Sequence, residues 1–593
     1  MEAIITPAQP RPTLGVKALP RFVLPLLLSV LVARAENWPQ FRGPSHQGVA
    51  EEKNAPLNWS GTSNVLWKTA IPGESWSSPI VWGDRVFVTT AEENGESCRV
   101  ISLDRGSGQV LWNRETFRQV PRHKQSRNTF ATPTPATDGE RVYACFGDGS
   151  FAALDFNGEL VWTNRDYPFY GEHGLGTSPI FHRGLLIMAR DGSSEGEDKK
   201  LGWQKPWDQS FVLALDSQTG KQRWKGRRGL SRISHGAPNI WEHDGQTEVV
   251  TEAGDVLQGF DFQTGERLWS SEVIGEGKVP SVVLGDGLAF TSGGWSGKET
   301  IKAFRLGGRG DLKEKNLVWE QSKDMPKVPS MLYLKPYLFA VTDGGAASCL
   351  KAETGEQVWR ERVGSSFSAS PVSAEGRIYF LADNGETTVI EAGPEFKVLA
   401  RDSLGERVQA SMAISQGNLF IRTVTNLYCI GDSSQVEGKI SGGLIGYWQF
   451  DESTGDGVQD SSNQGAGGML RGAVRVDGKF GNAIECRQDA LVEVPHRPIF
   501  DSTKEGLTVS AWVNRNEDAT WNMIVSREVK DGPSEYFGLA VVKNKALFSV
   551  DPDGAHYRNI KSTEDMPVGQ WIHLAGTYDN TEFKLYVNGK LVS

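Results

Sequence analysis

Two histidines and two arginines are the side chains of this sequence that are best placed to do chemistry. Each histidine stands a few residues before a proline that opens an expected strand, and the arginines lie close to the second histidine. The four residues are His173, Arg227, Arg228 and His235. Gathered at one mouth of a fold, they could form a polar funnel that holds an anion or a polar ligand. The alternative is that they hydrogen-bond to loop backbone, as buried polar groups usually do.

Motifs that would assign a catalytic residue or a metal ligand are missing from the sequence. It contains neither H-E-x-x-H nor G-x-S-x-G. The stretch Gly293–Glu299 is not a phosphate-binding loop, because Ser292 replaces the first glycine and Glu299 the final Ser/Thr. Arg309–Asp311 is interpreted as a turn. We therefore assign no catalytic residue and no metal site.

A repeated hairpin must position the four polar residues. In Ala214–Trp224, Asp216 begins a turn, Gly220 supplies the positive φ that the turn needs, and Trp224 follows on an alternating strand. The same unit recurs, with variations, along the first two thirds of the chain. Its tryptophans are expected to pack between neighbouring repeats, and they are Trp67, Trp112, Trp162, Trp224, Trp269, Trp319 and Trp359.

The spacing of these tryptophans predicts a β-propeller. Successive steps are 45, 50, 62, 45, 50 and 40 residues, which fits one four-stranded blade for each repeat. A seventh unit has Leu399 near the tryptophan position, and an eighth ends one strand short at Leu427–Ile430. The strand at Trp67 has no partners before it. We therefore predict eight blades, with the N-terminal strand pairing with Leu427–Ile430 to close the ring.

The A-L-D-x-x-T-G-x-x-x-W repeat resembles that of the pyrroloquinoline quinone (PQQ)-like propellers. These include quinoprotein alcohol dehydrogenases and non-enzymatic outer-membrane assembly lipoproteins. Trp38–Pro44 is similar to the start of a group of exported bacterial PQQ-like repeat proteins. The resemblance covers residues 38–430 and implies a fold more than an activity.

The N-terminus has the pattern of a secretory signal peptide. Arg21 precedes the short apolar run Phe22–Val32, and an A-x-A site follows at Ala33–Ala35. A membrane anchor is the alternative, although the run is short for a spanning helix. We expect an exported protein, periplasmic or extracellular, with no stable membrane insertion after cleavage. The formal net charge of −10 argues against nucleic-acid binding.

The five cysteines are scattered and include no adjacent pair and no C-x-x-C. Cys349 and Cys429 lie in apolar strand patterns, so buried free thiols are expected. Export would permit a disulfide, but the sequence names no pair.

A different domain follows a polar stretch rich in Asp, Ser and Gly. Strand runs at Leu507–Val513 and Gly569–Asp579, and a hairpin turn at Asn588–Gly589, resemble laminin-G-like, concanavalin A-like jelly rolls. Such a resemblance implies glycan or protein binding, sometimes with calcium. The acidic residues Asp451, Glu452, Asp456 and Asp460 could bind a cation, but solvated loop charge is the simpler interpretation.

The expected organisation is a signal peptide (1–35), an eight-bladed propeller (36–430), a linker (431–443) and a β-sandwich jelly roll (444–593). The returning strand after Gly589 is short, so we expect the jelly roll to be C-terminally incomplete. The whole chain is predicted to be all-β.

Three functions fit this organisation. The first is an exported, non-catalytic binding or scaffold protein, with a propeller for protein partners and a jelly roll for glycans or cell-surface ligands. The second is a PQQ-dependent oxidoreductase. The third is a carbohydrate-active protein targeted by its lectin-like domain. The PQQ-like resemblance implies a vicinal disulfide, a calcium and a catalytic Asp at a quinone site. No two cysteines are adjacent here, so we expect no bound PQQ.

Overall fold

The computed structural model describes residues 37–593, apart from 62, 296–299, 432–444, 453, 463–465, 480, 488, 498–499, 501–505, 518–519, 529–534, 552–556 and 580–581. The expected signal peptide and nearly all of the expected linker fall outside the described residues. The chain forms two compact units that divide between Gly431 and Asp432. Both are built of strands, and the one short helix described is the 3-10 turn η1 (Glu93–Gly95).

The described part of the first unit contains eight antiparallel sheets, each formed mainly by strands consecutive in sequence. The first four sheets are β3 (Ile80–Trp82), β4 (Arg85–Glu92), β5 (Ser97–Asp104) and β6 (Val110–Arg118); β7 (Ala136–Thr137), β8 (Arg141–Cys145), β9 (Phe151–Asp155) and β10 (Leu160–Asn164); β11 (Ile180–His182), β12 (Leu185–Arg190), β13 (Phe211–Asp216) and β14 (Gln222–Arg227); and β15 (Asn239–His243), β16 (Gln246–Glu252), β17 (Val256–Asp261) and β18 (Arg267–Glu272).

The other four sheets are β19 (Val283–Gly285), β20 (Leu288–Thr291), β21 (Ile301–Arg305) and β23 (Leu317–Gln321); β24 (Leu332–Leu334), β25 (Tyr337–Val341), β26 (Ala346–Lys351) and β27 (Gln357–Arg362); β28 (Val372–Ala374), β29 (Arg377–Leu381), β30 (Glu386–Glu391) and β31 (Val398–Ser403); and β32 (Ala413–Ser415), β33 (Asn418–Arg422), β34 (Asn426–Ile430) and β2 (Val65–Ala70).

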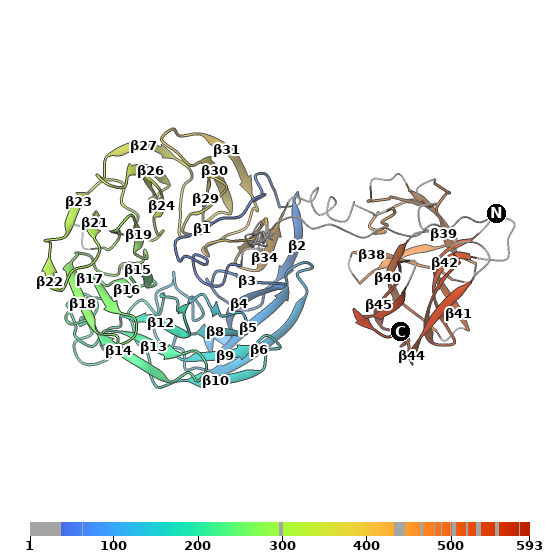
Figure 1. The fold of residues 1–593 in the computed structure, drawn as a ribbon, viewed down its shortest axis with the longest axis horizontal. Helices are drawn as coiled ribbons and strands as arrows, with labels where there is room; N and C mark the ends of the chain where they lie inside the picture. Colours follow the sequence, from blue (N-terminus) through green and yellow to red (C-terminus); the bar gives the residue numbers. More distant parts are fainter. Residues whose placement is uncertain are drawn as a thin grey trace, which may run out of the picture. The chain divides into compact units, whose positions relative to one another are not determined.

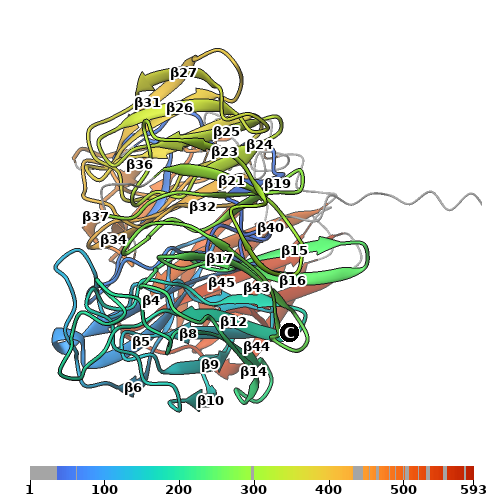
Figure 2. The same cartoon turned by 90° about the vertical axis from the view of Figure 1, so that its left-hand side faces the viewer.

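These sheets follow one another around a propeller-like ring, with the first strand of each toward the middle and the last at the rim (Figure 1). The β15–β16 hairpin projects beyond its neighbours in the turned view (Figure 2). A belt of hydroxyl groups links the starts of the inner strands. In six places a backbone N–H donates to a hydroxyl of the next sheet at 2.9–3.0 Å, from Ser78 to Thr134, Thr134 to Ser178, Ala237 to Ser281, Ser281 to Ser330, Ser330 to Ser370 and Ser370 to Ser411.

The predicted pairing of the N-terminal strand with the last repeat is confirmed. Trp67 of β2 lies opposite Cys429 of β34, and Thr69 opposite Leu427. Two further strands were not predicted. β22 (Gly310–Lys313) leaves its own repeat and pairs in parallel with β18, and β1 (Val49–Ala50) pairs in parallel with β28.

A segment that ends with β1 binds the inner strands of the ring. Innermost strands present unpaired backbone groups toward the axis, and these need partners. Trp38 exchanges two backbone hydrogen bonds with Val81, and the Gln47 amide contacts both backbone groups of Leu284. Further bonds link Pro39 O with Thr137 N, Gln40 Oε1 with Phe181 N, Arg42 Nη2 with Met331 O, and Gly48 O with Ser373 N. We call residues 38–50 the axial segment.

The second unit contains a jelly-roll domain whose two four-stranded sheets share one core. Its buried residues include Val509, Leu539, Phe548 and Leu574. The described strands are β35 (Gly457–Val458), β36 (Gly468–Arg471), β37 (Val474–Asp477), β38 (Asn482–Glu485), β39 (Leu491–Glu493), β40 (Leu507–Asn514), β41 (Trp521–Glu528), β42 (Glu535–Val542), β43 (Lys545–Val550), β44 (Arg558–Asp565), β45 (Trp571–Tyr578), β46 (Phe583–Val587) and β47 (Lys590–Leu591). The two large sheets are β40-β45-β46-β47 and β41-β42-β43-β44.

Two local predictions are confirmed. Asn588 and Gly589 both have positive φ, 50° and 77°, as expected for the turn that joins β46 to β47. Cys349 and Cys429 are buried free thiols, as are Cys98 and Cys145, whereas Cys486 is exposed. Among the described residues, no helix has the length and apolar character needed to cross a membrane.

Candidate functional site

The repeat tryptophans lie at the seams between successive sheets. In six of the seven, the indole N–H donates to a backbone carbonyl of the following sheet at 2.8–3.0 Å. Five of these rings also cover the turn glycine of the next repeat. A Cβ added at Gly265, for example, would lie 2.4 Å from the Trp224 ring, and its φ of +71° already disfavours a side chain. The turn glycine and the preceding tryptophan therefore form one packing unit.

Trp269 is the exception at these seams. Its indole donates instead to the buried carboxylate Oε2 of Glu248, within its own sheet, at 2.7 Å. The following repeat lacks the usual turn and contains β22, which lies along β18. The repeat that follows Trp269 departs from the sequence pattern of the other repeats. The Trp269 indole is also the one of the seven whose acceptor is a side chain and not a backbone carbonyl of the next sheet.

Two of the four predicted funnel residues come together. The His173 and His235 rings lie 5.8 Å apart, on loops that enter β11 and β15. Burial lowers the pKa of His173, and burial together with the nearby His173 ring lowers the pKa of His235 to about 3. Both imidazoles are therefore neutral near pH 7 and can each donate and accept a hydrogen bond.

Two tryptophans that the sequence analysis did not select stand beside this pair. Trp203 meets the His173 ring nearly edge-on at 6.0 Å. A Cβ at Gly277 would lie 3.4 Å from both the His173 ring and the Trp295 ring, so Gly277 lies between these two rings. The Lys327 ammonium sits 4.6 Å from the Trp295 ring centroid. We call His173, Trp203, His235 and Trp295 the mouth cluster.

Arg228 is not available to the mouth cluster. Its fully buried side chain forms an ion pair with Asp191, with Nε–Oδ1 at 2.5 Å and Nη2–Oδ2 at 3.0 Å. Burial raises the pKa of Asp191 to about 6 against the opposing effect of Arg228. Lys278 is paired in the same way with Glu252, at 3.2 Å. The structure therefore places Arg228 in a buried ion pair with a side chain, rather than in an open funnel or mainly against loop backbone.

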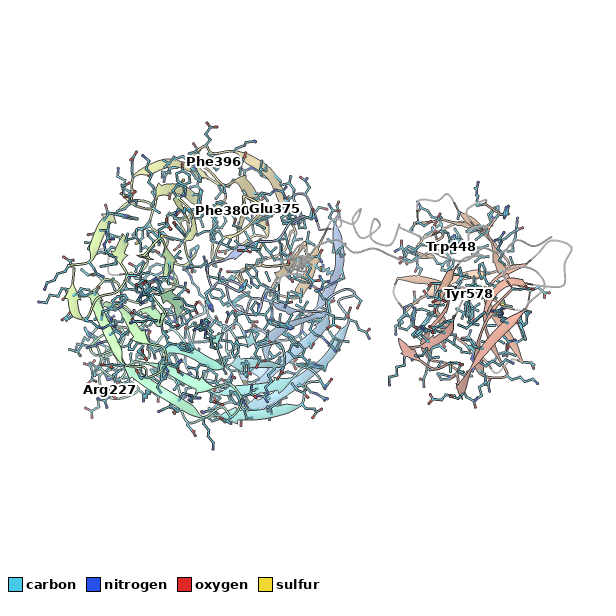
Figure 3. All side chains as sticks on the ribbon, viewed as in Figure 1. Arg227, Glu375, Phe380, Phe396, Trp448 and Tyr578 are labelled. Atoms are coloured by element: carbon cyan, nitrogen blue, oxygen red, sulfur yellow. The ribbon has the colours of Figure 1, made fainter. Side chains whose placement is uncertain are left out.

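Arg227 is also not part of the mouth cluster. It is exposed at the end of β14, the outer strand of its sheet, and lies on the rim of the ring (Figure 3). Successive residues of an extended chain point in opposite directions, so Arg227 and Arg228 cannot serve one funnel from neighbouring positions. The structure therefore brings together only the two histidines.

Arg227, Arg228 and the described cysteines do not form the PQQ site that the sequence resemblance implies. A quinone with several carboxylates needs paired cations, but Arg228 is bound to Asp191 and Arg227 lies at the rim. The buried cysteines are free thiols and do not form an adjacent pair. No group of three or more His, Cys, Asp or Glu side chains within the described ranges is arranged to hold a metal. We derive no reaction step through a quinone.

The jelly roll carries a second candidate site on an outer sheet face. Along β40, exposed Thr508, Ser510 and Trp512 alternate with inward residues, and His573 of β45 lies directly opposite Trp512. The two rings are 5.2 Å apart, and Trp512 is 39% exposed. Lys479 Nζ lies 3.9 Å from the Trp512 ring centroid. Aromatic rings beside hydroxyl groups suit a ligand with apolar and polar faces.

The acidic residues at the start of this unit have structural partners. Glu452 pairs with Arg475 at 2.7 Å, and Asp460 accepts backbone N–H groups of Tyr447, Ser462 and Ala466. Asp451 accepts the Asn482 N–H. These contacts support the interpretation of this cluster as loop charge.

Two models of known protein families match this chain, one in each compact unit. A family model described as "Outer membrane protein assembly factor BamB" matches residues 49–165, 208–298 and 311–393. Residues 487–593 match a model of the "Concanavalin A-like lectin/glucanases superfamily". The chain therefore carries PQQ-like repeats of the BamB type and a C-terminal concanavalin A-like domain.

Among curated proteins, the chain is similar to a polyvinylalcohol dehydrogenase from Pseudomonas sp., with 23% identity over 242 residues, covering 35% of this chain and 36% of the relative. It is also similar to a tetrathionate hydrolase from Acidithiobacillus ferrooxidans, with 19% identity over 241 residues, covering 39% and 44%. The matches thus span less than half of either relative.

Two solved structures illustrate the structural neighbours. BamB from Moraxella catarrhalis aligns with 62% of this chain and 96% of its own, at 11% identity and a TM-score of 0.42. Quinohemoprotein alcohol dehydrogenase from Comamonas testosteroni aligns with 66% and 80%, at 11% identity and a TM-score of 0.43.

Proposed function

We propose that this protein is an exported, non-catalytic binding protein, in which the propeller-like unit engages a polar ligand or a protein partner and the jelly roll engages a glycan. The observation that carries the proposal is the state of the charged groups behind the mouth cluster. Arg228 and Lys278 are each paired with a buried acid, and both imidazoles are held neutral. Neutral rings beside indoles bind by stacking and hydrogen bonding.

We further propose that the eight sheets are the blades of a closed propeller within residues 36–430, and that residues 431–443 link it to the jelly roll of residues 444–593. The β2–β34 pairing and the hydroxyl belt support this organisation. The sequence pattern of residues 1–35 supports export to the periplasm or beyond. A net charge of −10 supports partners other than nucleic acid.

The jelly-roll part of the proposal is tested with Trp512. We would measure binding of the full chain to soluble β-glucan, xylan, mannan and peptidoglycan fragments. Trp512→Ala should weaken binding at least about tenfold, as the loss of one stacking contact predicts. Trp521→Ala is the matched control, because Trp521 is 51% exposed in the same unit but lies on β41 of the other sheet. Equal losses for both variants would contradict the assignment.

An oxidoreductase is the second candidate function. The similarity to a polyvinylalcohol dehydrogenase favours it, because that relative is named for redox activity. PQQ would then be the cofactor that the family resemblance implies. The third candidate is a carbohydrate-active protein, and release of reducing sugar from the same glycans by the full chain would support it over simple binding.

A further inference from the structure

The axial segment holds a guanidinium group at the middle of the ring that has no counter-charge among the described residues. Arg42 is 2% exposed. Its Nη2 donates to the carbonyls of Gln47 and Met331 at 2.6 and 2.7 Å. Its Nε and Nη1 have no hydrogen-bond partner among the described residues. Three strong donor groups are therefore buried together, and only one of them is satisfied.

Two other buried cations of the ring have acidic partners, whereas Arg422, like Arg42, has none among the described residues. Arg228 has Asp191 and Lys278 has Glu252 as ion-pair partners. Arg42 has only carbonyl partners, and burial alone lowers its pKa, to about 9, with no described acid opposing the effect. A buried charge without a partner is strongly unfavourable. Among the described residues, Arg42 therefore has no acidic partner and too few acceptors for its donor groups.

The loop that carries Arg42 is closed on itself and contains a second buried donor. Gly48 N–H donates to Arg42 O at 2.9 Å and closes the loop. Arg42 and His46 both adopt left-handed backbone conformations, each with a φ of 61°, which non-glycine residues adopt at a cost. Trp38 Nε1, fully buried on the same segment, also has no acceptor among the described residues. Arginine and tryptophan side chains only donate, so the missing partner of each must be an acceptor.

We propose that Arg42 binds a small inorganic anion at the axis of the ring, and that this anion helps to fix the axial segment against the inner strands. The positive charge selects an anion over water, and the near-complete burial of Arg42 restricts the ligand to the size of a halide or a similar ion. The site is separate from the mouth cluster and does not depend on the proposed function.

The first test locates the ion. Crystals of the full chain would be soaked in sodium bromide, and anomalous scattering would be measured at the bromine edge. We expect an anomalous peak in contact with Arg42 Nε or Nη1. Ordered water in that place, without a peak, would overturn the proposal. A peak at Arg422, which is also buried with two unpartnered guanidinium nitrogens, would be a separate site.

The second test measures the effect in solution. Sodium bromide would be compared with sodium gluconate at equal ionic strength by thermal unfolding of the full chain. With bromide at ten times its Kd, the unfolding midpoint should rise by about 1–3 °C. Gln47→Ala is the matched control, because it removes the contact with Leu284 but leaves Arg42 in place. Its midpoint should be lower than that of the wild type, and its bromide shift unchanged.

In Arg42→Gln, the bromide-dependent rise of the unfolding midpoint should lose the part that comes from the Arg42 site. Arg42→Lys keeps the positive charge and should show the same rise, but only at a higher bromide concentration. An undiminished shift in Arg42→Gln, or none in the wild type, would overturn the proposal. If Arg42→Gln does not fold, the anomalous map and Arg42→Lys decide the question.

Discussion

The seams between sheets and the mouth of the ring are built on opposite principles. At six seams a tryptophan indole donates to a carbonyl of the next sheet, in nearly the same geometry each time. At the mouth, each tryptophan comes from a connection between the second and third strands of a sheet that is longer than the equivalent connection in the other sheets. Trp203 lies in the long connection between β12 and β13, and Trp295 in that between β20 and β21. The repeat thus specifies architecture, and the departures from it supply the candidate site.

The largest effect should come from removing one seam tryptophan. Trp224→Ala should lower the free energy of unfolding by about 3–5 kcal/mol, because it empties a packed site beside Phe260 and Phe262. Trp295→Ala at the mouth is the control, since its ring is 46% exposed and its loss should cost about 0.5 kcal/mol or less. Denaturant unfolding of both variants measures the difference. Equal costs would remove the distinction between seam and mouth.

A smaller effect is expected at the turn glycines. Gly265 and Gly287 have similar φ values, +71° and +75°, but an added Cβ would meet the Trp224 ring at Gly265 and open space at Gly287. Gly287→Ala should therefore cost about 1–2 kcal/mol for the backbone alone. Gly265→Ala should cost about 1–3 kcal/mol more, from overpacking against the ring. If chemical denaturation gave the two variants the same stability, the glycine–tryptophan contact would be unimportant.

The smallest effect concerns the neutral histidines of the mouth. The pKa of His235 falls from 6.5 to about 3 on folding, so the unfolded chain binds more protons between these values. Stability should therefore be lost as the pH falls from about 6.5 toward 3. His235→Asn should reduce that loss by about 1–2 kcal/mol. The pKa of Asp191 is raised to about 6, so this group makes stability change with pH in the opposite direction. The quantity to compare is therefore the difference between the stability–pH curves of the wild type and of His235→Asn. Superimposable curves would contradict a buried neutral His235.

The sequence predicted those parts of the structure that repeat along the chain. Counting strands was enough to predict that the strand at Trp67 pairs with the last repeat. The last repeat was one strand short, the strand at Trp67 had no neighbour before it, and unpaired strand edges need partners. It did not find β22, since a parallel edge strand from a neighbouring repeat leaves no periodic signal.

The candidate site was only half predictable. His173 and His235 were found because each precedes the proline of an inner strand, a position that the fold repeats. Arg227 lies on the rim and not with the histidines, because side chains alternate along a strand and proximity in sequence does not bring them together. Trp203 was missed, although the 62-residue step from Trp162 to Trp224 marked an insertion there. The axial role of Arg42 depends on contacts with inner strands far along the chain, which no local pattern reveals.

Titration of the purified full chain with PQQ in the presence of calcium tests the binding function most directly. Absorbance and heat would report binding, and dye-linked oxidation of alcohols and sugars would report turnover. We expect neither stoichiometric binding nor dye reduction, because Arg228 is held by Asp191 and Arg227 lies at the rim. One PQQ bound per chain, with turnover, would contradict the binding function and establish the oxidoreductase in its place.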